Sequence, residues 1–418
     1  MSKVNEKLLN ISIRALVMIS RFIFLFMLVK LLDPSDVGIY GLVVAAVGYS
    51  LYFVGLDFYT YTTREISSAS KQYWGSFLKR QGLLTLLLYI LVLPMLISLF
   101  YMDILPWSIL KWFFFLVVLE HICLELMRFF IAASEQVTAS IVLFLNQALW
   151  AVLVIGLMLL DESFRRLDYV LFFWLIGSSL AIVFSVFKIV KMNLGGWSTA
   201  VDFHWIVSGV KIAIPMLVAT LAFRGVFTFD RYWLESLAGL DVVAAYVLFI
   251  GVAGTLIAFL DAAVFSFVYP KLIHAYKNDD SKMYKKCMRE MLIFVSLFSV
   301  LFMIGSLLVF PYLLNWIDKP VYFQFFDIYY WVLAAMIINA FWMIFHYAIY
   351  SQRHDRHIVY SHLASIGSFL ILAFVFSSIW GYYSILVALC VSQLIILIWK
   401  LFAYVHLTPK HFFGISSA

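Results

Sequence analysis

Long apolar runs separated by short polar connections extend along the whole chain. A helix needs about 20 apolar residues to cross the hydrocarbon core of a bilayer. Twelve runs reach that length and predict helices over 8–31, 38–62, 82–102, 108–132, 139–160, 169–190, 206–229, 241–268, 291–314, 327–350, 358–378 and 382–404. The pattern therefore predicts an all-α polytopic membrane protein with twelve transmembrane helices.

Composition supports this prediction and excludes a soluble protein. Hydrophobic residues make up 65% of the 418 residues and charged residues 12%, whereas soluble domains are roughly 45–50% apolar and about 25% charged. The first apolar run is too long for the core of a signal peptide and lacks a small-residue cleavage site, so we expect it to remain as the first helix. The three cysteines, Cys123, Cys287 and Cys390, suggest no disulfide framework.

The distribution of lysine and arginine predicts the orientation. With a cytoplasmic N-terminus, nineteen of the 29 basic residues, Lys400 included, fall in inner connections and helix ends, and six fall on the outer side. The positive-inside rule then places both termini in the cytoplasm. The net charge of +6 is thus a topology signal, and the basic loops face anionic lipid head groups without requiring a nucleic-acid partner. Four cations lie within the spans: Arg14, Arg21, Lys211 and Arg224.

A short internal repeat suggests two halves. The segment "LLDPSDVGIY" (31–40) resembles "LAGLDVVAAY" (237–246), and the helix after each carries an acid near its cytoplasmic end, Asp57 and Asp261. We expect two six-helix lobes, with substrate bound near the midplane between them, as in transporters built from parallel repeats. The predicted parts are lobes 1–190 and 206–405, a cytoplasmic linker 191–205 and a cytoplasmic tail 406–418.

The first apolar run carries two charges that are costly in a bilayer. Each of Arg14 and Arg21 would cost at least about 2.5–3.5 kcal/mol at mid-membrane. At 100° per residue, Asn10, Arg14 and Arg21 lie within an arc of about 40°, with Lys7 just beyond. The helix therefore presents one cationic stripe, which must line a wet cavity or meet a partner.

Two interpretations of the stripe remain open. Arginine matches phosphate oxygens with two parallel hydrogen bonds, so Arg14 and Arg21 would line the path of an anionic head group. Alternatively, Arg14 forms a structural ion pair with Asp57, which lies at a similar depth on the second helix. Arg21 has no acid at matching depth on that helix, which favours the substrate for this residue.

The fourth and seventh helices add further candidates. His121, Glu125 and Arg128 share one face of "EHICLELMR", and Glu120 points about 100° away from His121. Buried carboxylates and a histidine suit a proton or cation relay, although a self-contained Glu125–Arg128 pair explains the same spacing. Asp57 and Asp261 are the other coupling or ion-pair candidates.

Lys211 and Arg224 of the seventh helix are further candidate contacts for an anionic substrate. Arg224 shares a face with Thr220 and Arg231, and its alternative partner is Asp230 or an acid of the eighth helix.

The segments "SRFIFLFMLVKLLDPSDVGIYGLV", "GLDFYTYTTREI" and "IPMLVATLAFRGVFTFDRYWL" resemble the polysaccharide flippases of the multidrug/oligosaccharidyl-lipid/polysaccharide exporter (MOP) superfamily. The resemblance implies transfer of undecaprenyl-pyrophosphate-linked oligosaccharide repeat units from the inner to the outer leaflet of the bacterial cytoplasmic membrane, for O-antigen, capsule or exopolysaccharide synthesis. It also implies a V-shaped central cavity between the two lobes. A glycan polymerase or a chain-length regulator would be a partner.

Two other classes compete with this interpretation. A cation-coupled drug exporter of the same superfamily would bind organic cations, for which a cation-rich first helix has the wrong charge. A membrane polymerase or acyltransferase needs catalytic groups, but the longest outer connection (315–326) is short and shows no nucleophile–base pair. We also find no phosphate-binding glycine-rich loop and no metal site in the turn 351–357, so we expect neither an enzyme nor a cofactor.

The topology is directly testable. Reporter fusions near residues 72, 195, 280 and 355 should report the cytoplasm, and fusions near 105, 163, 236 and 320 the outside, because of the basic-residue bias. An active periplasmic reporter at residue 280, where basic residues cluster, would contradict the twelve-span model.

Overall fold

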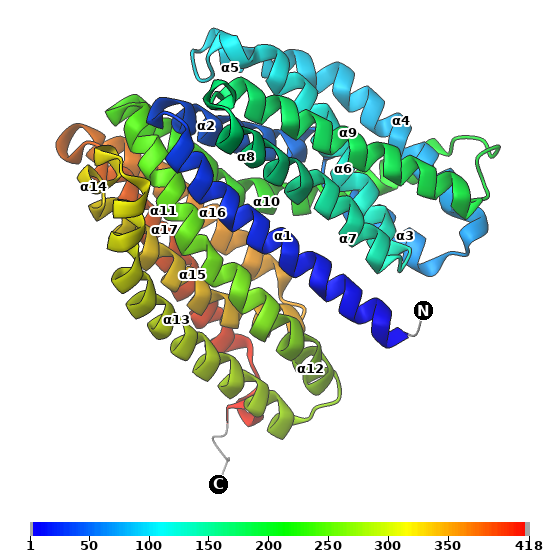
Figure 1. The fold of residues 1–418 in the computed structure, drawn as a ribbon. Helices are drawn as coiled ribbons and strands as arrows, with labels where there is room; N and C mark the ends of the chain where they lie inside the picture. Colours follow the sequence, from blue (N-terminus) through cyan, green and yellow to red (C-terminus); the bar gives the residue numbers. More distant parts are fainter. Residues whose placement is uncertain (1–2, 414–418) are drawn as a thin grey trace. The chain divides into compact units, whose positions relative to one another are not determined.

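The computed structural model describes residues 3–413, without the side chains of residues 3–5 and 7. Every regular element in this range is a helix, which confirms the all-α prediction (Figure 1). The chain divides into two compact units, Met1–Leu221 and Ala222–Ala418. The division falls inside helix α10 (Phe203–Ala238), beyond the linker predicted at 191–205.

The first unit holds the elements that precede α10. They are α1 (Lys3–Leu31), α2 (Pro34–Gly55), α3 (Tyr59–Ser68), α4 (Lys71–Leu96), α5 (Ser98–Tyr101), η1 (Trp107–Ile109), α6 (Leu110–Ala132), α7 (Gln136–Phe144), η2 (Leu145–Leu149), α8 (Trp150–Leu160), η3 (Glu162–Phe164) and α9 (Leu167–Met192).

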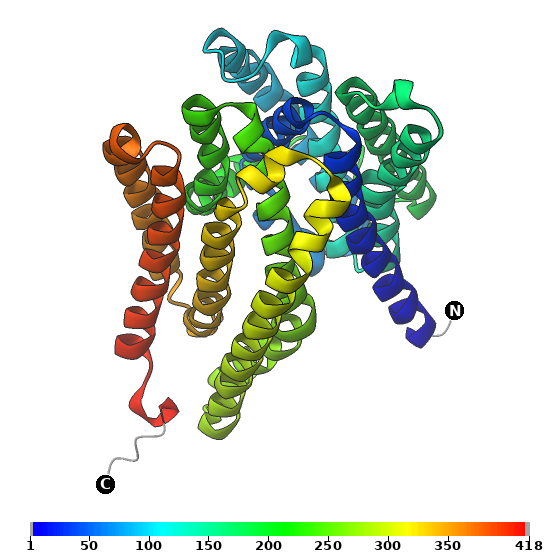
Figure 2. The same ribbon diagram turned by 60° about the vertical axis from the view of Figure 1, so that its left-hand side comes forward.

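The second unit holds the elements that follow α10. They are α11 (Leu240–Leu260), η4 (Asp261–Phe265), α12 (Ser266–Lys277), α13 (Ser281–Ile317), α14 (Pro320–Gln324), α15 (Asp327–Ser351), α16 (Asp355–Trp380), α17 (Tyr383–Leu407) and η5 (Lys410–Phe412). Helices α16 and α17 lie side by side, as the orange and red ribbons of Figure 2 show.

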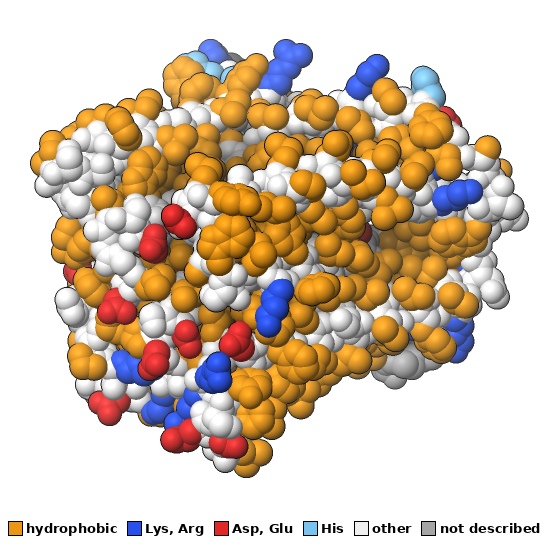
Figure 3. Space-filling model, turned by 90° about the horizontal axis from the view of Figure 1, so that it is seen from above, with side chains coloured by type: hydrophobic (Ala, Val, Ile, Leu, Met, Phe, Trp, Pro, Cys, Tyr) orange, Lys and Arg blue, Asp and Glu red, His pale blue; other side chains and the backbone are white. Residues whose placement is uncertain are grey.

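Eleven helices of the described chain are long and apolar enough to cross a membrane, against the twelve that the sequence predicted. The difference is α6, which forms as expected over 23 residues but carries Lys111, Glu120, Glu125 and Arg128. Large hydrophobic side chains are exposed along the helices, and they cover much of the face in Figure 3. Such a surface suits a lipid environment, where exposed apolar side chains contact hydrocarbon chains instead of water.

The predicted helix 38–62 is wrong in its second part, because α2 ends at Gly55. Leu56 and Asp57 adopt left-handed backbone conformations, with φ of 50° and 51°, and the separate helix α3 begins at Tyr59. A Cβ atom on Gly55 would lie 2.8 Å from Nε2 of His121. The absence of a side chain at Gly55 therefore lets α6 pack closely against the end of α2.

Two other predicted helices, 139–160 and 241–268, contain a π-helical turn. η2 separates α7 from α8, and η4 separates α11 from α12. Single π-helical turns inside α-helices occur often at functional sites. Asp261 begins η4, and Asp57 lies at the break after α2. The two acids that the internal repeat singled out thus both lie where a helix loses its regular geometry.

The connection between α9 and α10 packs onto α4 within the first unit. The backbone N–H of Gly75 donates to the carbonyl of Gly195 at 2.9 Å. Lys79 Nζ donates to the carbonyls of Trp197 and Thr199 at 3.1 and 3.0 Å. The predicted linker is therefore anchored to a helix at its centre.

This close approach predicts that Gly75→Ala destabilises the protein. Its Cβ would lie 2.5 Å from the Gly195 carbonyl oxygen, and overpacking of this kind costs about 1–3 kcal/mol. Gly82→Ala on the same helix is the matched control, because nothing lies within 4 Å of its Cβ. Thermal unfolding in detergent should show a lower midpoint for Gly75→Ala only. Equal midpoints for both variants would contradict the packing described here.

Candidate functional site

The polar face of α1 meets the polar face of α7 and η2. Arg14 Nε donates to Ser140 Oγ at 3.1 Å, and Arg21 donates to Gln147 Oε1 at 3.2 Å. Ser140 Oγ in turn donates to the side-chain oxygen of Asn10. Both arginine side chains are exposed. The predicted stripe is therefore present at Asn10, Arg14 and Arg21, whereas the Lys7 side chain lies outside the described residues.

The ion pair between Arg14 and Asp57, which the sequence left open as an alternative, is not among the ion pairs of the described residues. Helix α1 lies along α7 and α8 rather than along the end of α2 (Figure 1), and the Arg14 guanidinium donates to Ser140 of α7. Asp57 is instead a buried residue in the break after α2, where its carbonyl accepts from Thr60 Oγ1 at 2.9 Å. A helical-wheel argument gives depth and face, but it does not give the neighbouring helix.

Glu120 of α6 forms the centre of a second polar group, which we call the Glu120 cluster: Glu120, Asn146, Trp174 and Ser178. The Glu120 carboxylate accepts from Trp174 Nε1 and Ser178 Oγ, both at 2.7 Å, and from Asn146 Nδ2 at 3.2 Å. Three donors from two neighbouring elements, α9 and η2, therefore hold the carboxylate in place.

The π-helical turn η2 connects the Glu120 cluster to the stripe on α1. Asn146 donates to Glu120, and its neighbour Gln147 accepts from Arg21. Sequence reasoning missed this connection, although the polar pair Asn146–Gln147 inside an otherwise apolar run was a visible signal.

His121 and Glu125 belong to a separate network near the end of α2. Tyr89 Oη lies 2.9 Å from His121 Nδ1, and Arg128 donates to Glu125 Oε1 at 2.6 Å. Gln81 also donates to Glu125. His121 Nε2 is 3.9 Å from Glu125 Oε1 and has no hydrogen-bond partner among the described residues. The Glu125–Arg128 pair that we gave as the simpler alternative is present, and a relay through His121 stays a prediction.

The remaining cationic candidates lie on α10. Lys211 and Arg224 are exposed, and the Arg224 carbonyl accepts from Thr228 Oγ1 at 2.9 Å. Asp230, the alternative partner of Arg224, is buried and accepts from the backbone N–H of Arg231 at 2.7 Å and from the Tyr246 hydroxyl. Its oxygens are therefore used by groups other than Arg224.

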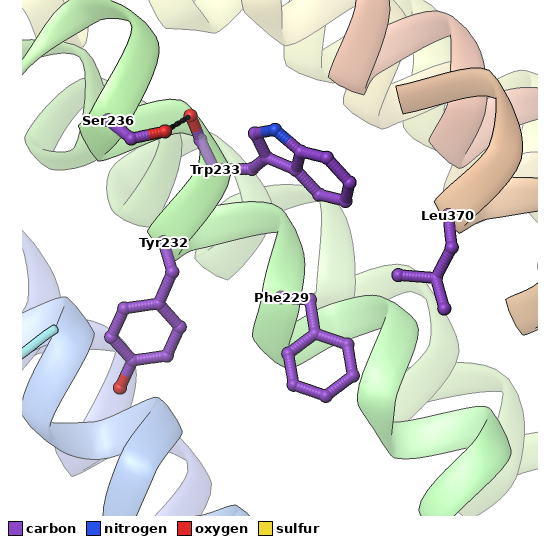
Figure 4. Close-up of a pocket in the computed structure, with 5 residues that line it drawn as sticks. All are labelled: Phe229, Tyr232, Trp233, Ser236 and Leu370. Atoms are coloured by element: carbon purple, nitrogen blue, oxygen red, sulfur yellow. Dashed lines mark hydrogen bonds between the residues drawn. The ribbon is translucent and has the colours of Figure 1, made fainter. Parts of the chain in front are cut away.

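Asp261 is the last of the predicted coupling residues. It is exposed at the start of η4. A pocket of about 370 Å³ in the second unit lies elsewhere, between α10 and α16. Figure 4 shows its five lining residues, Phe229, Tyr232, Trp233, Ser236 and Leu370. None of the five carries a charge, so the pocket offers an apolar surface to a ligand.

The sequence matches no family model and no curated protein closely enough to assign a family. Solved structures do match over nearly the whole chain. An inward-facing multidrug resistance MATE family transporter of the MOP superfamily aligns with a TM-score of 0.72 at 12% identity, over 98% of this chain and 99% of that one. The inward closed lipid II flippase MurJ aligns with a TM-score of 0.68 at 14% identity, over 97% and 90%.

A third match is a MOP superfamily transporter from Pyrococcus furiosus, with a TM-score of 0.59 at 12% identity over 96% of this chain and 94% of that one. Its description states that the reverse polarity of its binding pocket suggests a different function. The chain therefore has the fold of the multi-pass MOP superfamily transporters. The neighbours that carry this fold include both multidrug resistance transporters and a lipid II flippase.

The contact between α2 and α6 can be tested by filling the space at Gly55. In Gly55→Ala, the new Cβ would lie 2.8 Å from His121 Nε2 and displace an imidazole that Tyr89 holds. We expect a loss of about 1–3 kcal/mol in stability and lower activity at matched protein levels. Gly48→Ala on α2 is the control, because its Cβ meets nothing within 4 Å. Wild-type stability of Gly55→Ala would contradict the close packing of His121.

Proposed function

We propose that this protein flips undecaprenyl-pyrophosphate-linked oligosaccharides from the inner to the outer leaflet of a bacterial cytoplasmic membrane, by alternating access, for surface polysaccharide synthesis. The observation that carries the proposal is the exposed pair Arg14 and Arg21 on α1. Neutral acceptors, Ser140 and Gln147, hold the two guanidinium groups. Among the described residues, no carboxylate forms an ion pair with either arginine.

Neutral partners position the arginines without cancelling their charge. A guanidinium has five N–H donors, and each arginine gives one to its neutral partner. The remaining donors are available for phosphate oxygens, which guanidinium groups bind in a bidentate geometry. An anionic head group that crosses about 30 Å of hydrocarbon needs such compensation along its path.

The Glu120 cluster gives this path a second feature. Arg21 is joined to the Glu120 cluster through Gln147 and its chain neighbour Asn146. A pyrophosphate that binds Arg21 brings negative charge toward Glu120. Because like charges repel, this favours the protonated, neutral form of the Glu120 carboxyl group. We propose that substrate binding is coupled to the charge of Glu120 in this way. Lys211 and Arg224 would contact the anionic head group at another stage of the cycle.

The fold supports a transporter of this kind. MurJ, a lipid II flippase, shares the fold over 97% of this chain. MATE multidrug transporters share it as well, so fold alone leaves the substrate class open. The charge of α1 favours an anion over the organic cations of drug exporters. A glycan polymerase or a chain-length regulator is the partner that we propose for such a function.

The proposal predicts that transport needs both the positive charge of Arg21 and the planar, bidentate geometry of its guanidinium group. Arg21→Ala should abolish surface glycan, and Arg21→Lys should keep part of the activity because lysine supplies charge without planar bidentate donors. A charged hydrogen bond is worth about 1.5–3 kcal/mol, which corresponds to roughly 10- to 150-fold weaker binding. The measurements are surface-glycan display at matched membrane levels and binding of a soluble pyrophosphate analogue to purified protein.

Arg165→Ala is the matched control, because Arg165 pairs with Glu162 in an outer turn at 2.7 Å. Normal glycan display by Arg21→Ala would refute an anion path at this residue. A deletion strain with intact surface glycan but increased drug sensitivity would instead identify a drug exporter.

A further inference from the structure

Lys400 is the most unusual charged residue of the second unit. It is wholly buried, with 0% exposure, although it lies toward the C-terminal end of α17. Nζ lies 3.2 Å from Nδ1 of His346 and 3.1 Å from Nε2 of His362. We call Lys400, His346 and His362 the Lys400 triad. Lys400 lies toward a helix end, as the sequence predicts, but it is not exposed as a lysine at a helix end usually is.

Each member of the Lys400 triad comes from a different helix. His346 lies on α15, His362 on α16 and Lys400 on α17, three helices that pack together in one unit (Figure 2). Lysine at a helix end usually extends its amine to the aqueous interface. Here the Lys400 amine lies within hydrogen-bonding distance of two imidazoles instead.

Aromatic rings enclose the Lys400 triad. Lys400 Nζ lies 3.8 Å from the centre of the Trp342 ring, an arrangement that stabilises a cation. Trp342 Nε1 donates to Gln393 Oε1 at 3.0 Å, which fixes the ring. The Phe223 ring of α10 stacks on His362 at 5.0 Å. These contacts hold the three nitrogen atoms in one place.

Other titratable and charged side chains come from the helices packed around the Lys400 triad. From α15, Tyr347 and Tyr350 lie beside the His346 ring, and both contact Tyr269 of α12. Asp261 begins η4, Tyr404 lies farther along α17, and Arg224 of α10 follows Phe223 and is exposed. Among the described residues, no carboxylate lies in ion-pair contact with Lys400.

This geometry admits two charge states. A charged ammonium donates three hydrogen bonds and accepts none, so Nδ1 of His346 and Nε2 of His362 must both be unprotonated acceptors. A neutral amine accepts one hydrogen bond, so one imidazole can then donate to it. A second proton would place two positive charges about 3 Å apart in a low-dielectric interior, which is strongly unfavourable. The Lys400 triad therefore holds one extra proton or none.

We propose that the Lys400 triad is a proton-binding site that takes up and releases one proton in each transport cycle. Uptake converts the amine to an ammonium at the expense of a hydronium ion, and release returns the proton to water. Protonation changes which nitrogen atoms donate, and so changes how α15, α16 and α17 are held together. This inference rests on the proposed function only in naming the transport step that the proton drives, which is translocation of the lipid-linked oligosaccharide. Proton binding at the Lys400 triad does not depend on the identity of the substrate.

Two substitutions at Lys400 separate a proton site from a structural contact. Lys400→Arg keeps a charge that is not lost at any working pH, and Lys400→Met cannot gain one. In vesicles that contain purified protein, we expect wild type to translocate lipid-linked substrate faster under a pH gradient. Both variants should show equal rates with and without the gradient, and Lys191→Met at the exposed end of α9 should respond as wild type does. A wild-type gradient response in Lys400→Arg would overturn the proposal.

A second measurement needs no substrate. Nitrogen-15 NMR of protein labelled at lysine and histidine in lipid distinguishes ammonium from amine and imidazolium from imidazole. Lys400→Met and His362→Asn assign the signals of the Lys400 triad, and either variant suffices if the other fails to accumulate. We expect one protonation change within the Lys400 triad over the pH range of the folded protein. No change would overturn the proton site, whereas a change without translocation of lipid-linked glycan by wild type would contradict only the proposed function.

Discussion

The bilayer leaves polar groups no solvent to bind, and the rest of the structure depends on this constraint. Each buried donor and acceptor in a spanning helix has to find its partner inside the protein. The Glu120 cluster shows the outcome, because α9 and η2 direct three donors at one carboxylate. Arg14 and Arg21 show the complementary outcome, since neutral partners hold them in place while their charge remains available.

Polar chemistry in this protein gathers where helices lose their regular geometry. The π-helical turn η2 presents Asn146 and Gln147 to different neighbours, and Trp150 Nε1 donates to the Asn146 carbonyl at 2.7 Å. At the break after α2, Gly55 leaves room for His121 because it carries no side chain. In η2 the irregular turn and its polar partners on other helices occur together.

Hydropathy predicted nearly all of the helices, because about twenty consecutive apolar residues have few other stable arrangements in a membrane. It did not predict the end of α2 at Gly55 or the turn η2, since both depend on contacts with residues distant in sequence. The contact between Arg14 and Ser140 was not predicted, because depth and face do not identify the neighbouring helix. Lys400 was missed because its two histidines lie on other helices, and because proximity to a helix end suggested exposure.

The burial of Lys400 also bears on how the protein is made. On insertion scales a lysine at the centre of a spanning helix costs about 2.5–3.5 kcal/mol, and less toward its ends. Synthesis from the N-terminus delivers α15 and α16, with His346 and His362, before the ribosome releases α17. His346 and His362, the bases that receive Lys400, therefore precede it in the order of synthesis. The order of the helices along the chain thus places both bases ahead of the lysine that they accept.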